Sequence, residues 1–217
     1  MTRIHGNLAS LFGAKEAGRS ANLLKQPLKK LSTGLAIDSA KDNPAGLIAS
    51  ELLRSDLGAL REAIDGATRS AGVLSTADAA LGEINDMLSK ARGLAVQAAN
   101  TAGMPEEAAA ALQQQMDATL DAVNRTANAA EFGGQKLLDG NMEAAIYEAG
   151  SIELEQVSTA TLATGGDPAV ESLETVRAGG TNSLATNPAG AAQALERAIL
   201  DVSTERGRIG AFVSQRI

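Results

Sequence analysis

A row of apolar residues with a seven-residue period runs along the middle of the chain, and it limits the fold more than any other feature. The steps between successive apolar positions alternate between four and three, except near Leu74, where two steps of three follow each other. The row consists of Leu53, Leu57, Leu60, Ile64, Ala67, Ala71, Leu74, Ala77, Leu81, Ile84, Leu88, Ala91, Ala95 and Ala98. Such alternation is typical of a coiled-coil seam, the narrow apolar row that one helix buries against another, and the irregular step is a stammer. The pattern predicts one long helix that packs lengthwise on partner helices.

Capping residues indicate where this helix begins and ends. Asp42 and Asn43 offer side-chain caps, Pro44 suits the first helical position, and Gly103 supplies a stop. A helix over 44–100 would be about 85 Å long at 1.5 Å per residue. A compact domain of 217 residues is narrower than that. We therefore expect an elongated molecule.

Two further helices are predicted to pack on the first. Pro105 followed by two acids opens the second helix, and Asn187 with Pro188 opens the third. A short connection makes the second helix antiparallel to the first. Its seam is predicted at Leu112, Met116, Thr119, Val123, Ala127 and Ala130, and that of the third helix at Leu195, Ile199, Val202, Arg206, Ile209 and Val213. The predicted class is mainly α, an elongated antiparallel helical bundle or coiled coil.

The segment between the second and third predicted helices has a different pattern. Residues 132–140 are rich in turn-forming types, and residues 145–162 alternate between polar and apolar types with several β-branched side chains. This pattern predicts one or two short β-hairpins. Residues 164–187 are rich in Gly, Thr, Asn and Ser, which favours a loop with one helical turn near 170–173.

The first 40 residues carry an apolar stripe of their own. It includes Leu8, Leu11, Leu24, Leu28 and Leu31, and Gly34 suits the left-handed residue that ends a helix. Pro27 lies inside this stretch, so we expect a kink or a break there. No segment of matching length remains to cover the stripe, which indicates assembly with other chains.

Composition argues against several classes of function. The net charge of −7 offers no basic surface for nucleic acid or an anionic membrane. Cysteine is absent, which removes disulfides, thiolate metal sites and cysteine nucleophiles. Aromatic residues make up only 2%, so a core must be built mainly from Ala and Leu. The N-terminus has no long apolar stretch of a secretory signal, so export would need another route.

No catalytic, cofactor-binding or metal-binding site is predicted. His5 is the only histidine, and one histidine does not make a metal site without other strong ligands. The glycine pairs at 133–134 and 179–180 lack the lysine and hydroxyl residues of a phosphate-binding loop and are interpreted as turns. The acids at 106–107 suit a helix N-terminus, and those at 153 and 155 suit a strand edge. We expect a non-enzymatic protein without cofactors.

Six segments of the sequence are recognisable as motifs: residues 31–35 (LSTGL), 39–51 (SAKDNPAGLIASE), 81–88 (LGEINDML), 92–100 (RGLAVQAAN), 131–140 (EFGGQKLLDG) and 207–212 (GRIGAF). In this order, and over almost the whole chain, they resemble bacterial flagellins. The resemblance implies a structural subunit of the extracellular flagellar filament, exported without a cleaved signal peptide. It also implies other flagellin subunits as partners, with an export chaperone and a filament cap, and neither nucleic acid nor membrane.

The resemblance also assigns a role to each part of the chain. Residues 1–43 would form the inner tube of the filament, and 44–140 the rod domain with its two helices and turn. Residues 141–187 would be a shortened variable region, and 188–217 the C-terminal rod helix. A family member would continue past Ile217 through a returning inner helix, so the chain is expected to be truncated or atypical.

Flagellins of many motile bacteria are recognised by a Toll-like receptor on the long rod helix. The corresponding positions in this chain are Lys90, Leu94 and Gln115. Leu94 matches the family, but Lys90 lacks the planar fork of arginine and Gln115 replaces an acid. The resemblance therefore implies weak receptor activation or none.

Two alternatives remain open at this point. A hook–filament junction protein shares the architecture of flagellin. A signalling or adaptor coiled coil, such as a helical hairpin of a chemoreceptor, would share the seams but would contain no β-hairpin. Residues 132–162 argue against the adaptor, and electron microscopy would separate filaments, expected of flagellin, from soluble dimers, expected of the adaptor.

Overall fold

The computed structural model describes residues 8–100, 105–146, 150–164 and 171–216. The predicted class, a mainly α antiparallel bundle with a small β-hairpin region, is confirmed. The chain divides into two compact units, residues 1–61 and 62–217. Helix α2 (Pro44–Asn100) contributes residues to both units. Its predicted stop, Gly103, lies outside the described residues.

The first unit contains α1 (Leu8–Thr33) and the beginning of α2. Gly34 has a φ of 68°, the left-handed conformation expected at the end of a helix. A kink or a break was predicted at Pro27, and the break is not found, because α1 continues through this residue. Proline removes one helical hydrogen bond, and this 26-residue helix continues despite that loss.

Helices α2 and α4 (Pro188–Arg216) begin in the same way. The side chain of Asn43 accepts a hydrogen bond from the backbone N–H of Gly46 at 2.9 Å. Asn187 accepts one from Gly190 at 3.0 Å, and a proline follows each asparagine. A Cβ on Gly46 would lie 2.7 Å from the Asn43 amide nitrogen, and one on Gly190 would lie 2.3 Å from that of Asn187. In both helices the glycine at the third position after asparagine thus lies directly against the capping side chain.

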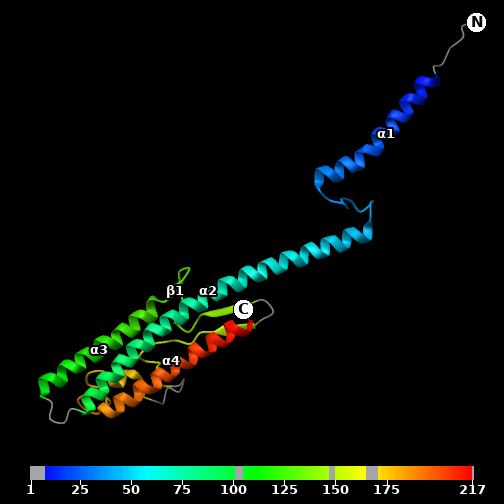
Figure 1. Ribbon diagram of the computed structural model, residues 1–217. Helices are drawn as coiled ribbons and strands as arrows, with labels where there is room; N and C mark the ends of the chain where they lie inside the picture. The colour runs from blue at the N-terminus through cyan, green and yellow to red at the C-terminus, as the bar shows by residue number, and fades with distance from the viewer. Residues whose placement is uncertain (1–7, 101–104, 147–149, 165–170, 217) are drawn as a thin grey trace, which may run out of the picture. The chain divides into compact units, whose positions relative to one another are not determined.

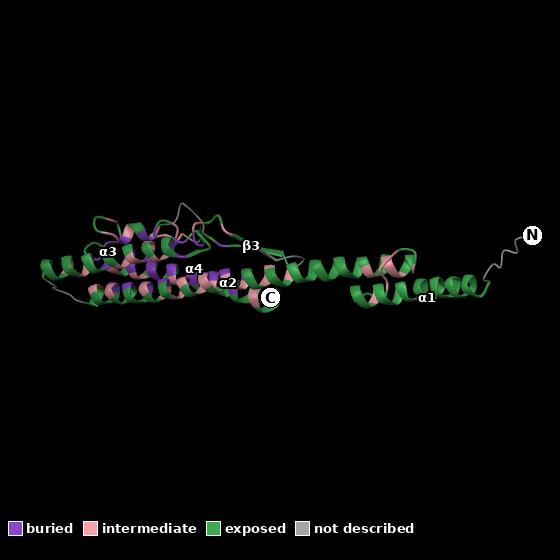
Figure 2. Ribbon diagram, turned by 90° about the horizontal axis from the view of Figure 1, so that it is seen from above, coloured by how far each residue is buried: buried purple, intermediate pink, exposed green. Residues whose placement is uncertain are grey.

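In the second unit, α3 (Glu106–Ala129) and α4 lie alongside the second half of α2 (Figures 1 and 2). Both run antiparallel to α2 (Figure 1), and two ion pairs between α2 and α4 show this for α4. Arg92 lies 3.3 Å from Glu196, and Asp78 lies 2.7 Å from Arg206. Residue numbers that rise along one helix and fall along the other fix the antiparallel register.

The core of the second unit lies between these three helices. Its fully or almost fully buried side chains from the helices include Leu74, Leu81, Ile84, Leu88, Met116, Leu120, Val123, Leu195, Val202 and Ile209. Leu112 and Ile199 are half-buried and pack against this core. On α3 the buried residue is Leu120 and not the predicted Thr119, because a helix of 3.6 residues per turn drifts away from a strict seven-residue repeat.

Four predicted seam residues do not belong to the core of this chain. Leu53, Leu57, Leu60 and Ile64 are exposed, with exposed fractions from 53% at Leu57 to 63% at Ile64. These residues are exposed because α2 is longer than the two helices that pack on it. Helix α2 has 57 residues, whereas α3 has 24 and α4 has 29. The buried residues of α2 accordingly begin at Ser70.

Two short antiparallel hairpins follow α3. In the first, β1 (Glu131–Phe132) pairs with β2 (Gln135–Lys136) around two glycines with positive φ. In the second, β3 (Glu143–Ile146) pairs with β4 (Gly150–Glu153). The expected helical turn is a 3-10 turn, η1 (Leu173–Val176), a few residues later than predicted.

A row of polar side chains on α3 holds the connection between β4 and α4. Gln113 donates to the carbonyl of Val176 at 3.0 Å and accepts from the N–H of Leu184 at 2.8 Å. Further along α3, Asn124 accepts from the N–H of Thr159 at 2.9 Å. Two acids between them bind the same connection: Asp117 accepts from the N–H of Ala178, and Asp121 from the side chain of Arg177. This row, spaced by one helical turn, ties the connection to the bundle.

Replacing a core residue of α2 destabilises the chain far more than replacing an exposed one. We expect Ile84→Ala to lower the free energy of unfolding by about 2–5 kcal/mol, because it leaves a cavity. Leu57→Ala, the control on the same helix, changes it by less than about 0.5 kcal/mol. Urea unfolding of the unassembled chain followed by circular dichroism measures both. Equal losses would contradict the core described above.

Gln113→Ala leaves a buried carbonyl and a buried N–H without their partner. We expect a loss of about 1–3 kcal/mol in unfolding free energy and faster hydrogen exchange at the Leu184 amide. Gln114→Ala, at the exposed neighbouring position, is the matched control. The assignment is wrong if the two variants exchange at the same rate at Leu184.

Candidate assembly surfaces

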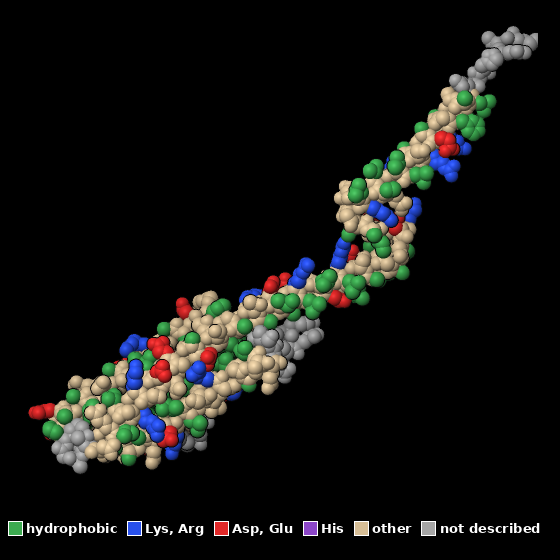
Figure 3. All heavy atoms as spheres, viewed as in Figure 1, with side chains coloured by type: hydrophobic (Ala, Val, Ile, Leu, Met, Phe, Trp, Pro, Cys, Tyr) green, Lys and Arg blue, Asp and Glu red, His purple; other side chains and the backbone are tan. Residues whose placement is uncertain are grey.

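Helix α1 exposes all of its large apolar side chains. None of its residues is buried, and its exposed fractions range from 59% at Leu24 to 81% at Leu31. Hydrophobic side chains are visible along its surface in Figure 3. The large apolar residues of this surface are Leu8, Leu11, Phe12, Leu23, Leu24, Leu28 and Leu31. Leu24, Leu28 and Leu31 follow the steps of four and three that align residues on one side of a helix.

The first half of α2 carries a second exposed apolar surface. Leu53, Leu57, Leu60 and Ile64 form one row, and Ile48 with Leu52 begins another. At 100° per residue, the two rows lie on adjacent sides of the helix, so the apolar face is wider than a single coiled-coil seam. Such a face can accommodate more than one partner helix.

Charge is distributed unevenly between the two units. Residues 1–61 contain nine Lys or Arg and five Asp or Glu, whereas residues 62–217 contain ten and 21. The first unit is therefore net positive and the second strongly negative. Electrostatic attraction therefore favours contact between the first unit of one copy and the second unit of another over contact between two first units or two second units.

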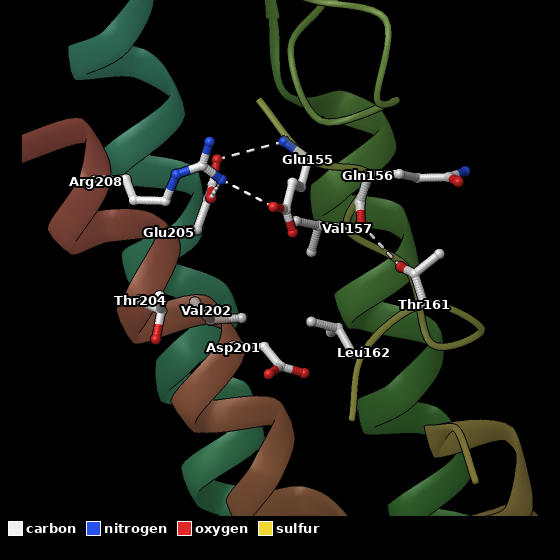
Figure 4. A pocket seen from close by; sticks show the side chains of 10 residues that line it. All are labelled: Glu155, Gln156, Val157, Thr161, Leu162, Asp201, Val202, Thr204, Glu205 and Arg208. Atoms are coloured by element: carbon white, nitrogen blue, oxygen red, sulfur yellow. Dashed lines mark hydrogen bonds and ion pairs between the residues drawn. The ribbon is translucent and has the colours of Figure 1, made fainter. Parts of the chain in front are cut away.

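The α4 side of the connection forms a small pocket, with a volume of about 230 Å³ (Figure 4). Arg208 lies between two carboxylates, 2.9 Å from Glu155 and 2.7 Å from Glu205. Glu205 is buried and also accepts from the backbone N–H of Glu155. One turn earlier, Asp201 accepts from the N–H of Ala163, a residue with a φ of 71°. These carboxylates hold the connection to α4, which gives them a structural role.

The remaining candidates from the sequence are the histidine, the acidic residues and the glycine pairs. No group of three or more His, Cys, Asp or Glu side chains there could hold a metal ion. His5 lies outside the described residues. Gly133 and Gly134 form the hairpin turn, and Gly180 packs so closely that a Cβ would lie 2.1 Å from the carbonyl oxygen of Thr175. None of the described helices is long and apolar enough to cross a membrane.

The predicted receptor positions lie on two helices. Lys90 and Leu94 are one turn apart on α2, and Gln115 is on α3. Lys90 and Gln115 are exposed, whereas Leu94 is half-buried and packs against the core. Leu94 thus contributes to the bundle as well as to any surface.

Two features of these surfaces were missed from the sequence. The apolar row that begins with Ile48 and Leu52 was not predicted, because the seven-residue repeat beside it is the more regular pattern. The polar row from Gln113 to Asn124 follows helical spacing, which was a usable signal, but the sequence does not show what these side chains bind.

Comparison of sequences relates the chain to flagellins. It is 34% identical to polar flagellin F of Vibrio parahaemolyticus over 170 residues, covering 75% of this chain and 45% of that protein. It is 28% identical to a flagellin of Bacillus subtilis over 237 aligned residues, covering 96% of this chain and 78% of that protein. The chain spans less than half the length of several of the flagellins that it matches.

A solved structure and a family model also match the chain. The crystal structure of Bacillus cereus flagellin superposes with a TM-score of 0.52 at 23% identity, covering 69% of this chain and 82% of that one. The family model described as the bacterial flagellin N-terminal helical region matches residues 4–143. Because this match covers more than half of the chain, the protein belongs to the bacterial flagellin family.

Proposed function

We propose that the chain is a structural subunit of the bacterial flagellar filament and that it assembles through the exposed faces of α1 and the first half of α2. The observation that carries the proposal is the series of exposed Leu, Ile and Phe residues on these two helical segments. Family membership and the names of the relatives support it. The partners are other copies of flagellin.

The exposed faces supply enough driving force for assembly. Burial of one Leu or Ile side chain contributes about 1.5–3 kcal/mol. Large apolar surfaces of this kind mark contacts with other molecules. Helix α1, which has no buried residue in the single chain, gains its stabilisation from the neighbouring subunits.

The parts of the chain take the roles that the family implies. Residues 1–43 form the inner tube, 44–140 and 188–217 form the rod, and 141–187 form a reduced variable region. The hydrogen bonds from α3 and α4 to this variable region support a filament surface without projecting outer domains.

Location and remaining partners follow from the same role. The filament is extracellular, and the subunit reaches it through a dedicated export route without a cleaved signal peptide. An export chaperone and a filament cap cover its assembly surfaces before and during growth. The subunit is not an enzyme, which the structural use of Asp201 and Glu205 supports. A signalling coiled coil is disfavoured, since two hairpins interrupt the helices.

Charges on the exposed face of α2 should prevent self-association without unfolding the chain. We expect the double variant Leu57→Asp/Leu60→Asp to keep its helical circular dichroism and melting behaviour, because both side chains are exposed. Its self-association, measured by sedimentation at rising concentration with electron microscopy for filaments, should weaken at least about tenfold.

Leu200→Asp, an exposed apolar position on α4 outside this face, is the control and should associate like the unmodified chain. Unchanged association of the double variant, or an unmodified chain that stays monomeric at all concentrations, would contradict the proposed surface.

Weak activation of the Toll-like receptor is proposed to depend on Lys90 and Gln115. Restoring a planar cation and an acid with Lys90→Arg/Gln115→Glu should raise the signal of receptor-expressing reporter cells severalfold. Gln114→Glu, which adds the same charge one residue away, should not. An equal response to both variants would reject the role of these positions.

A further inference from the structure

Arg206 is the only charged residue in the predicted seams of α2, α3 and α4. On α2, Ile64 and Ala71 belong to a series with a spacing of seven, and the next position of that series holds Asp78. The stammer moves the buried position by one residue, to Ala77, which is fully shielded from water. A charged residue thus occupies a seam position on α4 and an interrupted seam position on α2.

These two charged residues bind each other. The Nε of Arg206 donates to Oδ1 of Asp78 at 2.7 Å, and its Nη2 donates to Oδ2 at 3.4 Å. A Cβ on Gly82, one turn further along α2, would lie 3.8 Å from each of three guanidinium atoms, Cζ, Nη1 and Nη2. Equal distances to these atoms mean that the flat face of the guanidinium group is turned toward α2. The contact is a planar fork, a geometry that arginine provides and lysine does not.

Apolar burial alone permits more than one alignment of α4 on α2. The apolar row of α2 continues toward the start of the helix with the same steps of four and three, and such a row can pair again after a slip of one heptad. Ala71 and Val213 line one hollow between the two helices. After a slip of seven residues toward the start of α2, Val213 would face Ile64, an exposed side chain that α4 would then cover. The apolar seam does not reject this slipped alignment.

The slipped alignment is unfavourable for Arg206. The residues seven positions before Asp78 and Gly82 are Ala71 and Ser75, so Arg206 would lose both of its hydrogen bonds to a carboxylate. A cation without a partner in an apolar seam is costly. In the observed alignment the side chains of Arg206 and Asp78 are 38% and 41% exposed, and ion pairs with such exposure contribute little net stability. The pair therefore discriminates between alignments more than it stabilises the observed one.

We propose that Arg206 and Asp78 form a register key that selects the part of α2 on which α4 packs. A single polar contact in an apolar seam can specify one register at little gain in stability. The key places α4 on the part of α2 that begins at Ser70 and rejects the apolar row before it. The same holds for α4 of another copy, because Ile64 and Leu57, earlier in the same series, offer no carboxylate either.

The consequence for assembly rests on the function proposed above, whereas the choice of register does not. If α4 slipped by one heptad, it would cover part of the apolar row that is proposed to bind other subunits. The key keeps that row uncovered in the folded second unit. It therefore acts on specificity, by preventing the chain from occupying its own assembly surface.

A rival explanation is that the connection between β4 and α4 sets the position of α4. This connection is bound to α4 through Asp201 and Glu205 and to α3 through Gln113. The two explanations differ in which substitution changes the alignment. Removal of the key should change it in our account, and removal of an anchor of the connection should change it in the rival account.

The absence of cysteine allows both explanations to be tested by paired spin labels. Cysteines introduced at Ser89 on α2 and Ser214 on α4, both exposed, would be the only thiols. Pulsed electron spin resonance at concentrations that keep the chain monomeric measures the distance distribution between the labels. A slip of one heptad toward the start of α2 lengthens this distance by about 10 Å, at 1.5 Å per residue. With no further substitution we expect a single distance.

Arg206→Leu should add a second population about 10 Å longer, with little change in the melting temperature. Arg197→Leu, which removes another exposed arginine of α4, is the matched control and should keep the single distance. Asp201→Ala, which loosens the connection, should keep it as well. Asp78→Ala/Ala71→Asp moves the carboxylate by one heptad and should make the longer distance the main one. Circular dichroism shows whether each variant keeps its helices.

A single, unshifted distance in either Arg206→Leu or Asp78→Ala/Ala71→Asp would overturn the proposal. A second distance in Asp201→Ala with none in Arg206→Leu would also overturn it and would assign the register to the connection. The labels report on monomers, so failure of the key and failure of filament assembly are seen separately. The predicted shifts in a chain that never associates would retain the key and reject the proposed function.

Discussion

The structure depends on the burial of one side of α2 between two shorter helices. Helices α3 and α4 cover α2 from Ser70 onward, where Leu74, Leu81, Ile84 and Leu88 are almost fully shielded from water. The apolar pattern continues beyond that point toward the start of α2, where the described residues provide no helix to cover it. One helix thus combines a stable half, which holds the second unit together, with an exposed half that is available for other molecules.

Polar contacts complement this apolar core. Helix α3 binds the connection between β4 and α4 from one side through Gln113 and Asn124, and α4 binds it from the other through Asp201 and Glu205. Most of these bonds reach backbone groups, which are present whatever the side chain. The connection is thereby fixed without a large core of its own.

Much of the fold could be predicted from the sequence, because caps and periodicity are local signals. The starts of α2 and α4 follow from asparagine and proline, and the end of α1 from Gly34. Burial was less predictable. Leu57 and Leu81 occupy equivalent positions in the same repeat, yet only Leu81 is buried, because burial depends on how far the partner helices reach. The side-chain bonds of Gln113 and Arg206 connect segments that are distant in the sequence, which spacing alone does not show.

Hydrogen exchange measured by mass spectrometry on the monomeric chain tests the division of α2 most directly. We predict strong protection for backbone amides between residues 74 and 95, which lie among core side chains, and weak protection between 48 and 64 and within α1. Assembly should then raise protection in the weakly protected segments. Uniform protection along α2 in the monomer would contradict the account, since it would mean that the exposed half needs no partner to be stable.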